Sequence, residues 1–170
     1  MKSSVFLCLT LCVAIHAHDD EVHYDFAHCT FEALPGSHIC FRKENAGVQA
    51  TINILGLTPH LDYKMHVHKG TASTGCPDVG PHYNLPETPE DEGDLGSFSS
   101  DGNGLVFKCG LQLHDNLSLD STNPIIGKSV AIHIEEHRKI CCNIEASTEE
   151  KNKGFMKNDG SPDSTLNCPE

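Results

Sequence analysis

The sequence predicts an all-β domain, a sandwich or barrel of about eight short strands. Three observations support this class. Short stretches alternate apolar and polar residues with a period of two, most clearly over residues 48–54. Turns rich in Gly, Pro, Asn and Asp separate these stretches. No helical period of useful length occurs before Ser147. A chain of 170 residues is long enough to bury the core of one such domain.

The first half of the domain begins with a hairpin. Residues 26–33 and 38–43 are expected to form its strands, and L-P-G-S at 34–37 is its turn. Cys29 and Cys40 lie nearly opposite each other across that turn, so we expect a disulfide between them. The turn E-N-A-G leads into the alternating strand at 48–54, and G-L-T-P-H ends it. The next strand is expected to begin at about Tyr63.

The second half starts with a loop, because residues 81–92 are rich in Pro, Glu and Asp. Residues 93–99 and 104–111 then flank S-D-G-N, a strong hairpin turn. A polar connection follows, and the runs at 125–134 and 139–144 are expected to be the last strands. Residues 147–170 are rich in Lys, Asn, Gly, Ser and Asp, so we expect a flexible C-terminal tail after a domain at 18–146.

Residues 1–17 are typical of a secretory signal peptide. Lys2 supplies the positive end, residues 5–15 are apolar, and the small residue Ala17 precedes the expected cleavage before His18. The apolar run is too short to span a bilayer. We therefore expect a secreted, extracellular protein with no membrane partner.

Charge and cysteine content restrict the partners further. The formal net charge of −12 argues against nucleic acid or an anionic membrane as a partner. Two of the nine cysteines lie in the signal peptide, and most of the remaining seven are expected to form disulfides after export. Their odd number leaves one thiol free or bonded to another chain. The sequon at Asn116 predicts a glycan there.

The strongest chemical signal is at residues 65–84. His66 and His68 are two residues apart on an expected strand, so both imidazoles lie on one face. Imidazole is a ligand that suits copper and zinc. His82 adds a third imidazole from the loop that follows. An H-x-H pair by itself can also be an ordinary surface feature, and its significance depends on the sequence around it.

Three blocks of this sequence resemble the copper/zinc superoxide dismutase family, over residues 24–144. The first block contains the H-x-H pair and Cys76 and ends in G-P-H-Y-N at 80–84. The second is G-D-L-G at 93–96, and the third is N-P-I-I-G-K-S-V-A-I-H at 123–133. The resemblance implies an eight-stranded Greek-key β-barrel, an immunoglobulin-like sandwich. It also implies conversion of two superoxide anions to dioxygen and hydrogen peroxide.

The resemblance further implies roles for single residues. The positions that match the four copper ligands are His66, His68, His82 and His133. Arg138 matches the arginine that guides superoxide to the copper, and a guanidinium suits a small anion. Cys76 and Cys141 match the disulfide that ties the metal-site loop to the last strand.

Three cysteines remain without assigned partners. Cys141 and Cys142 are adjacent on an expected strand, so their side chains point to opposite faces and need different partners. With the pairs above assigned, Cys109, Cys142 and Cys168 compete for one further bond.

The zinc half of the family site is incomplete. Asp94 matches the zinc aspartate, but Asp91 stands where the family has a zinc histidine. No histidine lies between His82 and Asp94, so we expect no tight zinc site. A carboxylate of Asp94, Glu90 or Glu92 could instead orient His82 by accepting its other N–H. The link from His133 to Arg138 is also short, which resembles the copper-only, short-loop branch of the family.

The leading interpretation is a secreted, copper-dependent superoxide dismutase with a degenerate zinc site. The chain also resembles the superoxide-dismutase-like plasma proteins of bivalve haemolymph, some of which assemble into large particles. The alternative is therefore a non-catalytic, self-assembling metal-binding or carrier protein of extracellular fluid, which would be a homo-oligomer. Its twelve histidines and its acidity favour this alternative.

Overall fold

The computed structural model describes residues 23–45, 47–73, 76–84, 92–113, 116–120, 123–134 and 138–147. The expected signal peptide, Asp91, Cys168 and the tail beyond Ser147 lie outside these residues. In the part that is described, no helix has the length and apolar character needed to cross a membrane.

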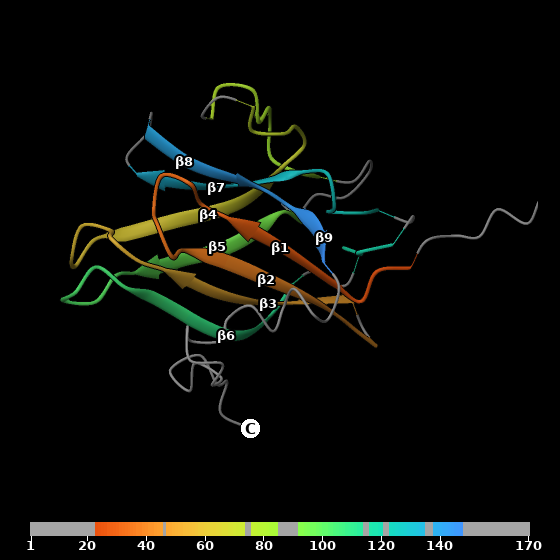
Figure 1. Ribbon diagram of the computed structural model, residues 1–170, viewed down its shortest axis with the longest axis horizontal. Coiled ribbons are helices and arrows are strands. Elements are labelled where there is room, and N and C mark those ends of the chain that lie inside the picture. Colours follow the sequence, from red (N-terminus) through yellow and green to blue (C-terminus); the bar gives the residue numbers. More distant parts are fainter. Residues whose placement is uncertain are drawn as a thin grey trace, which may run out of the picture.

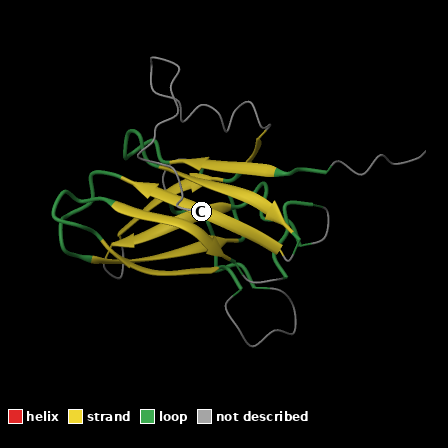
Figure 2. Cartoon of the chain, turned by 90° about the horizontal axis from the view of Figure 1, so that it is seen from below, coloured by secondary structure: helices red, strands yellow, loops and turns green. Residues whose placement is uncertain are grey.

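The described residues form nine strands in two antiparallel sheets that pack on each other (Figures 1 and 2). The first sheet has the order β6-β3-β2-β1-β9, with strands β1 (Phe26–Thr30), β2 (His38–Glu44), β3 (Gly47–Ile54), β6 (Val106–Gln112) and β9 (Glu145–Ser147). The second sheet has the order β5-β4-β7-β8, with strands β4 (Asp62–His68), β5 (Asp94–Ser99), β7 (Ser129–Ile134) and β8 (Arg138–Asn143).

The strand order is that of a Greek key. β3 pairs with β6, and β4 pairs with β7, although neither pair is consecutive in the chain. The connections from β3 to β4, from β5 to β6 and from β6 to β7 pass from one sheet to the other. The hairpin predicted at S-D-G-N is therefore wrong, because β5 and β6 pair with β4 and β3 and not with each other. The predicted all-β Greek-key class is confirmed.

The ninth strand arises because the last run of the chain changes sheets at Ile144. The Ile144 N–H donates to the Lys128 carbonyl at 2.8 Å, and the Gly127 N–H donates to the Ile144 carbonyl at 2.9 Å. Beyond this corner β9 pairs with β1 and ends at Ser147, opposite Phe26. The strand extends one residue past the predicted domain boundary, and it forms the edge of the first sheet beside β1.

Gly127 also explains a strand that begins later than predicted. The run at 125–134 is apolar enough for a strand throughout, but Gly127 has φ +80° and the Lys128 N–H donates to the Ile125 carbonyl at 3.1 Å. These residues form a turn, because a left-handed backbone does not fit a sheet. β7 therefore starts at Ser129.

The core lies between the sheets, and β4 illustrates how it is built. Tyr63, Met65 and Val67 are all buried in the core, at the two-residue period of a strand. Each side chain of this size stabilises the fold by about 1.5–3 kcal/mol when it is fully buried. The same alternation turns His66 and His68 to the opposite face of β4, as the sequence predicted.

The disulfide predicted between Cys29 and Cys40 is wrong. In the β1–β2 ladder Cys29 lies opposite Ile39, and Cys40 lies opposite His28. Neighbouring residues on a strand face opposite sides, so this offset places the two sulfurs on different faces of the sheet. Cys29 is fully buried and bonds to Cys142 of β8, whereas Cys40 is a free, half-buried thiol.

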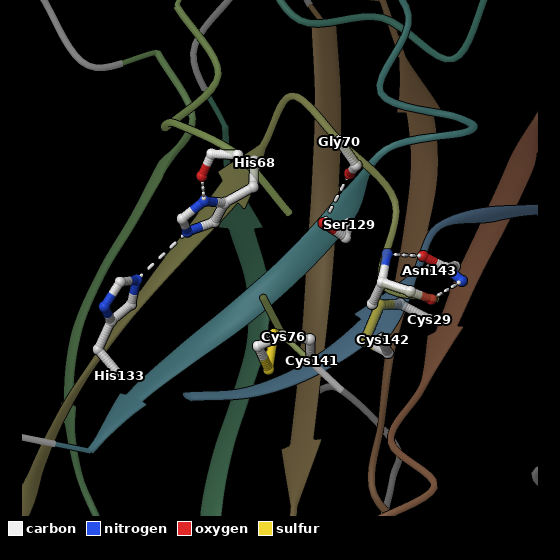
Figure 3. Close-up of a disulfide and its surroundings, with 11 residues drawn as sticks. Cys29, His68, Gly70, Cys76, Ser129, His133, Cys141, Cys142 and Asn143 are labelled. Atoms are coloured by element: carbon white, nitrogen blue, oxygen red, sulfur yellow. Dashed lines mark hydrogen bonds between the residues drawn. A yellow bond between two sulfur atoms is a disulfide. The ribbon is translucent and has the colours of Figure 1, made fainter. Parts of the chain in front are cut away.

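The prediction that Cys141 and Cys142 have different partners is confirmed. Cys141 bonds to Cys76 and Cys142 bonds to Cys29 (Figure 3). Cys109 is disulfide-bonded as well, to a partner outside the described residues.

Candidate metal site

Four imidazoles gather on the face of the second sheet that points away from the core. Their ligand atoms all lie within 4.8 Å of one another, and the residues are His66, His68, His82 and His133. The first two come from β4 and the last from β7, its partner strand. The remaining histidine comes from the loop, which forms an isolated β-bridge to β4 at His68. Three separate segments thus contribute to one cluster.

The rings are arranged in two stacked pairs. The centroids of His66 and His82 are 3.9 Å apart with the rings 16° from parallel. The centroids of His68 and His133 are 5.5 Å apart at 23°. Rings from different pairs meet edge to face, for example His66 and His133 at 89°. The cluster is partly closed to water, since His66 is 8% exposed and His68 only 1%.

The hydrogen bonds of His68 decide which of its nitrogens can bind a metal. Its Nδ1 lies 2.8 Å from the Gly80 carbonyl oxygen, which can only accept, so Nδ1 carries the proton. Its Nε2 then presents a lone pair toward the Nε2 of His133, 3.3 Å away (Figure 3). Two nitrogens with bonds of about 2.0 Å to one tetrahedral ion have about this separation. The site therefore fits a metal ion that prefers imidazole.

The loop at 69–73 and 76–81 is held against the cluster by its own backbone. The Lys69 N–H donates to the Pro81 carbonyl at 3.0 Å, and the Gly70 N–H donates to the Val79 carbonyl at 2.8 Å. The carbonyl of Gly70 accepts from the Ser129 hydroxyl at 2.8 Å. A Cβ at Gly70 would lie 2.4 Å from the Asp78 carbonyl oxygen, so no larger residue fits this close approach.

Strand β8 holds the same loop by two further contacts (Figure 3). The Asn143 side chain accepts from the Ala72 N–H at 2.7 Å and donates to the Ala72 carbonyl at 2.9 Å. The Cys76–Cys141 disulfide, which the family resemblance implied, adds a covalent link. The loop that delivers His82 is therefore fixed at both ends.

A closed ring of three backbone hydrogen bonds sets the spacing of the cluster. The Val67 N–H donates to the Gly93 carbonyl at 2.7 Å, the Gly93 N–H to the Tyr83 carbonyl at 2.9 Å, and the Tyr83 N–H to the Val67 carbonyl at 2.8 Å. Val67 separates the two histidines of β4, Tyr83 follows His82, and Gly93 precedes Asp94. We call Val67, Tyr83 and Gly93 the backbone ring. It connects β4, the loop that carries His82 and the start of β5.

Asp94 lies beside His66. Its Oδ1 lies 3.5 Å from Nε2 of His66, and it also accepts the Gly96 N–H at 2.7 Å. The carboxylate is half exposed, at 52%. It was expected to bind a second metal or to orient His82. In the described part of the chain, the four histidines are the only group of three or more metal-type ligands that gather. The expectation that zinc is doubtful is compatible with this arrangement.

Arg138 begins β8 directly opposite Ile134, the residue after His133. Its backbone is therefore next to the β7 end of the site, and its side chain lies outside the described part of the structure.

A lysine lies over the tyrosine of the backbone ring. The Lys128 Nζ is 4.6 Å from the centroid of the Tyr83 ring. Burial, together with the charge of Lys69, lowers the pKa of Lys128. Burial and the nearby carboxylate of Glu92 raise the pKa of Tyr83. Tyr83 therefore stays neutral at physiological pH, and the face of its ring attracts the ammonium group of Lys128.

From the sequence, Glu92 was named only among the carboxylates that could orient His82, and its burial was not predicted. This side chain is 1% exposed, and its Oε1 accepts the Asn116 Nδ2–H at 2.9 Å. An acidic stretch such as E-D-E gives no indication of which carboxylate will be buried. Asn116 was singled out only as a sequon, and its predicted glycan stays a prediction.

Comparison with known proteins agrees with the site. The family model described as copper/zinc superoxide dismutase (SODC) matches residues 36–155. A protein of Botryotinia fuckeliana named superoxide dismutase [Cu-Zn] is 33% identical over 100 residues, covering 54% of this chain and 64% of the relative. One of the same name from Candida albicans is 32% identical over 104 residues, covering 55% and 66%. The chain thus spans just under two thirds of these curated relatives. Because the family model covers well over half of the sequence, this chain belongs to the copper/zinc superoxide dismutase family.

Proposed function

We propose that this protein is a copper-dependent superoxide dismutase, which converts two superoxide anions and two protons to dioxygen and hydrogen peroxide. The observation that carries the proposal is the gathering of four imidazoles from β4, β7 and the loop. The residues that would hold copper are His66, His68, His82 and His133. The relatives' shared name, superoxide dismutase [Cu-Zn], supports the same activity.

Copper held by these imidazoles would supply a one-electron redox couple that both half-reactions need. The chain itself orients the imidazoles and partly excludes water from them. The Gly80 carbonyl fixes the tautomer of His68, and Asp94 lies within 3.5 Å of His66. Such partners orient imidazole ligands and raise their basicity. We assign the guidance of superoxide to Arg138, because its strand register places it beside the β7 end of the site.

We also propose that the zinc site is degenerate and that the protein is secreted. The absence of histidine between His82 and Asp94 supports the first point. The apolar leader and the two disulfides resolved among the described residues support the second. N-terminal sequencing of the exported protein should identify His18 as its first residue.

Metal content and dismutase rate measured on one native sample test the function. We expect close to one copper per chain, little zinc, and a fast rate that disappears in His66→Ala. His23→Ala is the matched control, because His23 is exposed and lies outside the cluster. Copper-loaded protein with no rate above that of buffer would rule out the enzyme.

The second candidate is a self-assembling metal carrier. The formal net charge of −12 favours it, because a negative protein slows the approach of an anion. Mixed or sub-stoichiometric metal, a negligible rate and a large particle in size-exclusion chromatography would support the carrier. A monomer with full activity would exclude it.

A further inference from the structure

The side chain of Glu92 is almost completely buried, with 1% of its surface exposed. A carboxylate taken out of water needs hydrogen-bond donors close by. Asn116 provides one through its Nδ2, 2.9 Å from Oε1 of Glu92. Asn116 itself is exposed and belongs to the connection between β6 and β7, far from Glu92 in the sequence.

Glu92 is in direct contact with the backbone ring. It is covalently bonded to Gly93, whose N–H donates to the Tyr83 carbonyl at 2.9 Å and whose carbonyl accepts the Val67 N–H at 2.7 Å. The backbone at Gly93 is too closely packed to move without displacing its neighbours. A Cβ on Gly93 would lie 2.7 Å from the Val67 carbonyl oxygen and 2.9 Å from that of Tyr83. A displacement of Glu92 would therefore move the ring.

The segment that carries Asn116 is anchored independently of the metal site. Leu117 is buried in the core at 1% exposure. The Ser118 N–H donates to the Asn123 carbonyl at 3.2 Å, and the Ile125 N–H donates to the Ser118 carbonyl at 2.9 Å. Asn116 thus projects from a fixed position, and its amide can act as a support for Glu92.

We propose that Asn116 is a positioning residue of the metal site, which acts through the buried carboxylate of Glu92 on the backbone ring. Its hydrogen bond holds the junction at Glu92 and Gly93, and thereby the distance of His82 from the two histidines of β4. This inference rests on the proposed copper site. It gives the residue of the sequon a role in metal binding that is independent of any glycan.

The test compares copper binding in full-length variants made in a host that does not glycosylate asparagine. Cu(II) affinity is measured by competition with a chelator, and the electron paramagnetic resonance spectrum of bound Cu(II) reports ligand geometry. Asn116→Asp replaces the donor with a second carboxylate that faces Glu92. We expect an altered spectrum and an affinity about 10-fold below that of the wild type, the lower end of the effect of removing a partner that hydrogen-bonds a metal ligand, because Asn116 acts through Glu92 and the backbone.

Reciprocal rescue separates positioning from a general structural role. In E92Q/N116D the amide and the carboxylate exchange places, so the amide introduced on the β5 side can donate to the carboxylate introduced in the β6–β7 connection. This variant should recover most of the affinity and the wild-type spectrum. Asn45→Asp is the matched control, because it adds the same charge at an exposed turn and should change neither.

The outcomes are distinguishable. Wild-type protein that binds no copper would refute the proposed function. Wild-type protein that binds copper while N116D binds it equally well would overturn this inference alone, as would a loss that E92Q/N116D does not recover. Asn116→Ala removes the donor without adding charge, so it decides the question if N116D fails to fold. Unchanged affinity in N116A also overturns the proposal.

Discussion

The Cys29–Cys142 disulfide joins β1 to β8 across the two sheets, and it should make a large contribution to the free energy of unfolding. It joins residues 113 apart in the chain. In the chain-entropy model a loop of that length is worth about 4.8 kcal/mol at 25 °C. The second disulfide, Cys76–Cys141, shortens the covalent path between Cys29 and Cys142 to about 50 residues, which reduces the value to about 4.1 kcal/mol.

The perturbation is the double variant C29A/C142A. Its urea unfolding should show a free energy of unfolding about 3–5 kcal/mol below that of the wild type, since native strain and lost packing change the ideal value. Such a loss is a large part of the stability of a typical domain. C40A is the matched control. It removes a half-buried cysteine without a disulfide and should cost about 1 kcal/mol or less.

Two results would refute the reasoning. A loss in C29A/C142A no greater than that in C40A would show that the bond does not constrain the unfolded chain. Non-reduced peptide mapping after cleavage at Glu32 separates Cys29 from Cys40. It should find the Cys29 and Cys76 peptides both attached to the peptide that contains Cys141 and Cys142. A Cys29–Cys40 pair in that map would contradict the structure directly.

Three further predictions concern other parts of the fold. Gly93→Ala should lower the free energy of unfolding by about 2–4 kcal/mol, because the new Cβ breaks the backbone ring. Gly102→Ala is the control: its Cβ would meet no atom closer than 3.6 Å, and it should change the free energy of unfolding by about 0.5 kcal/mol. Equal urea midpoints for the two variants would exclude a role for the close approach. The hydrogen bond from Lys43 holds the pKa of Asp120 below its usual value. The resulting stabilisation is present above the unfolded pKa, about 3.9, and is lost as pH falls through the folded pKa, so the melting temperatures of wild type and Asp120→Asn should converge in acid. Burial raises the pKa of Cys40 to about 12, so iodoacetamide at pH 8 should alkylate native Cys40 at least about 100-fold more slowly than the unfolded chain. Equal rates would show that the thiol is not withdrawn from solvent.

The sequence by itself determined the features that depend on local periodicity. Alternation at a period of two identified β3, and the same period predicted that His66 and His68 share one face of the next strand, opposite Val67. The adjacent cysteines of β8 had to face opposite sides for the same reason. The family blocks supplied the four histidines that the structure then gathered.

Tertiary structure alone decided the features that depend on register and on contacts between distant segments. A shift of one residue in the β1–β2 ladder moves Cys40 to the opposite face from Cys29, and nothing in the hairpin sequence fixes that shift. Likewise, the register shift between β4 and β5 places Asp94, the first residue of β5, opposite His66. Local patterns specify which face a side chain takes, but packing between the sheets selects its partner, because burial of the whole core sets the register.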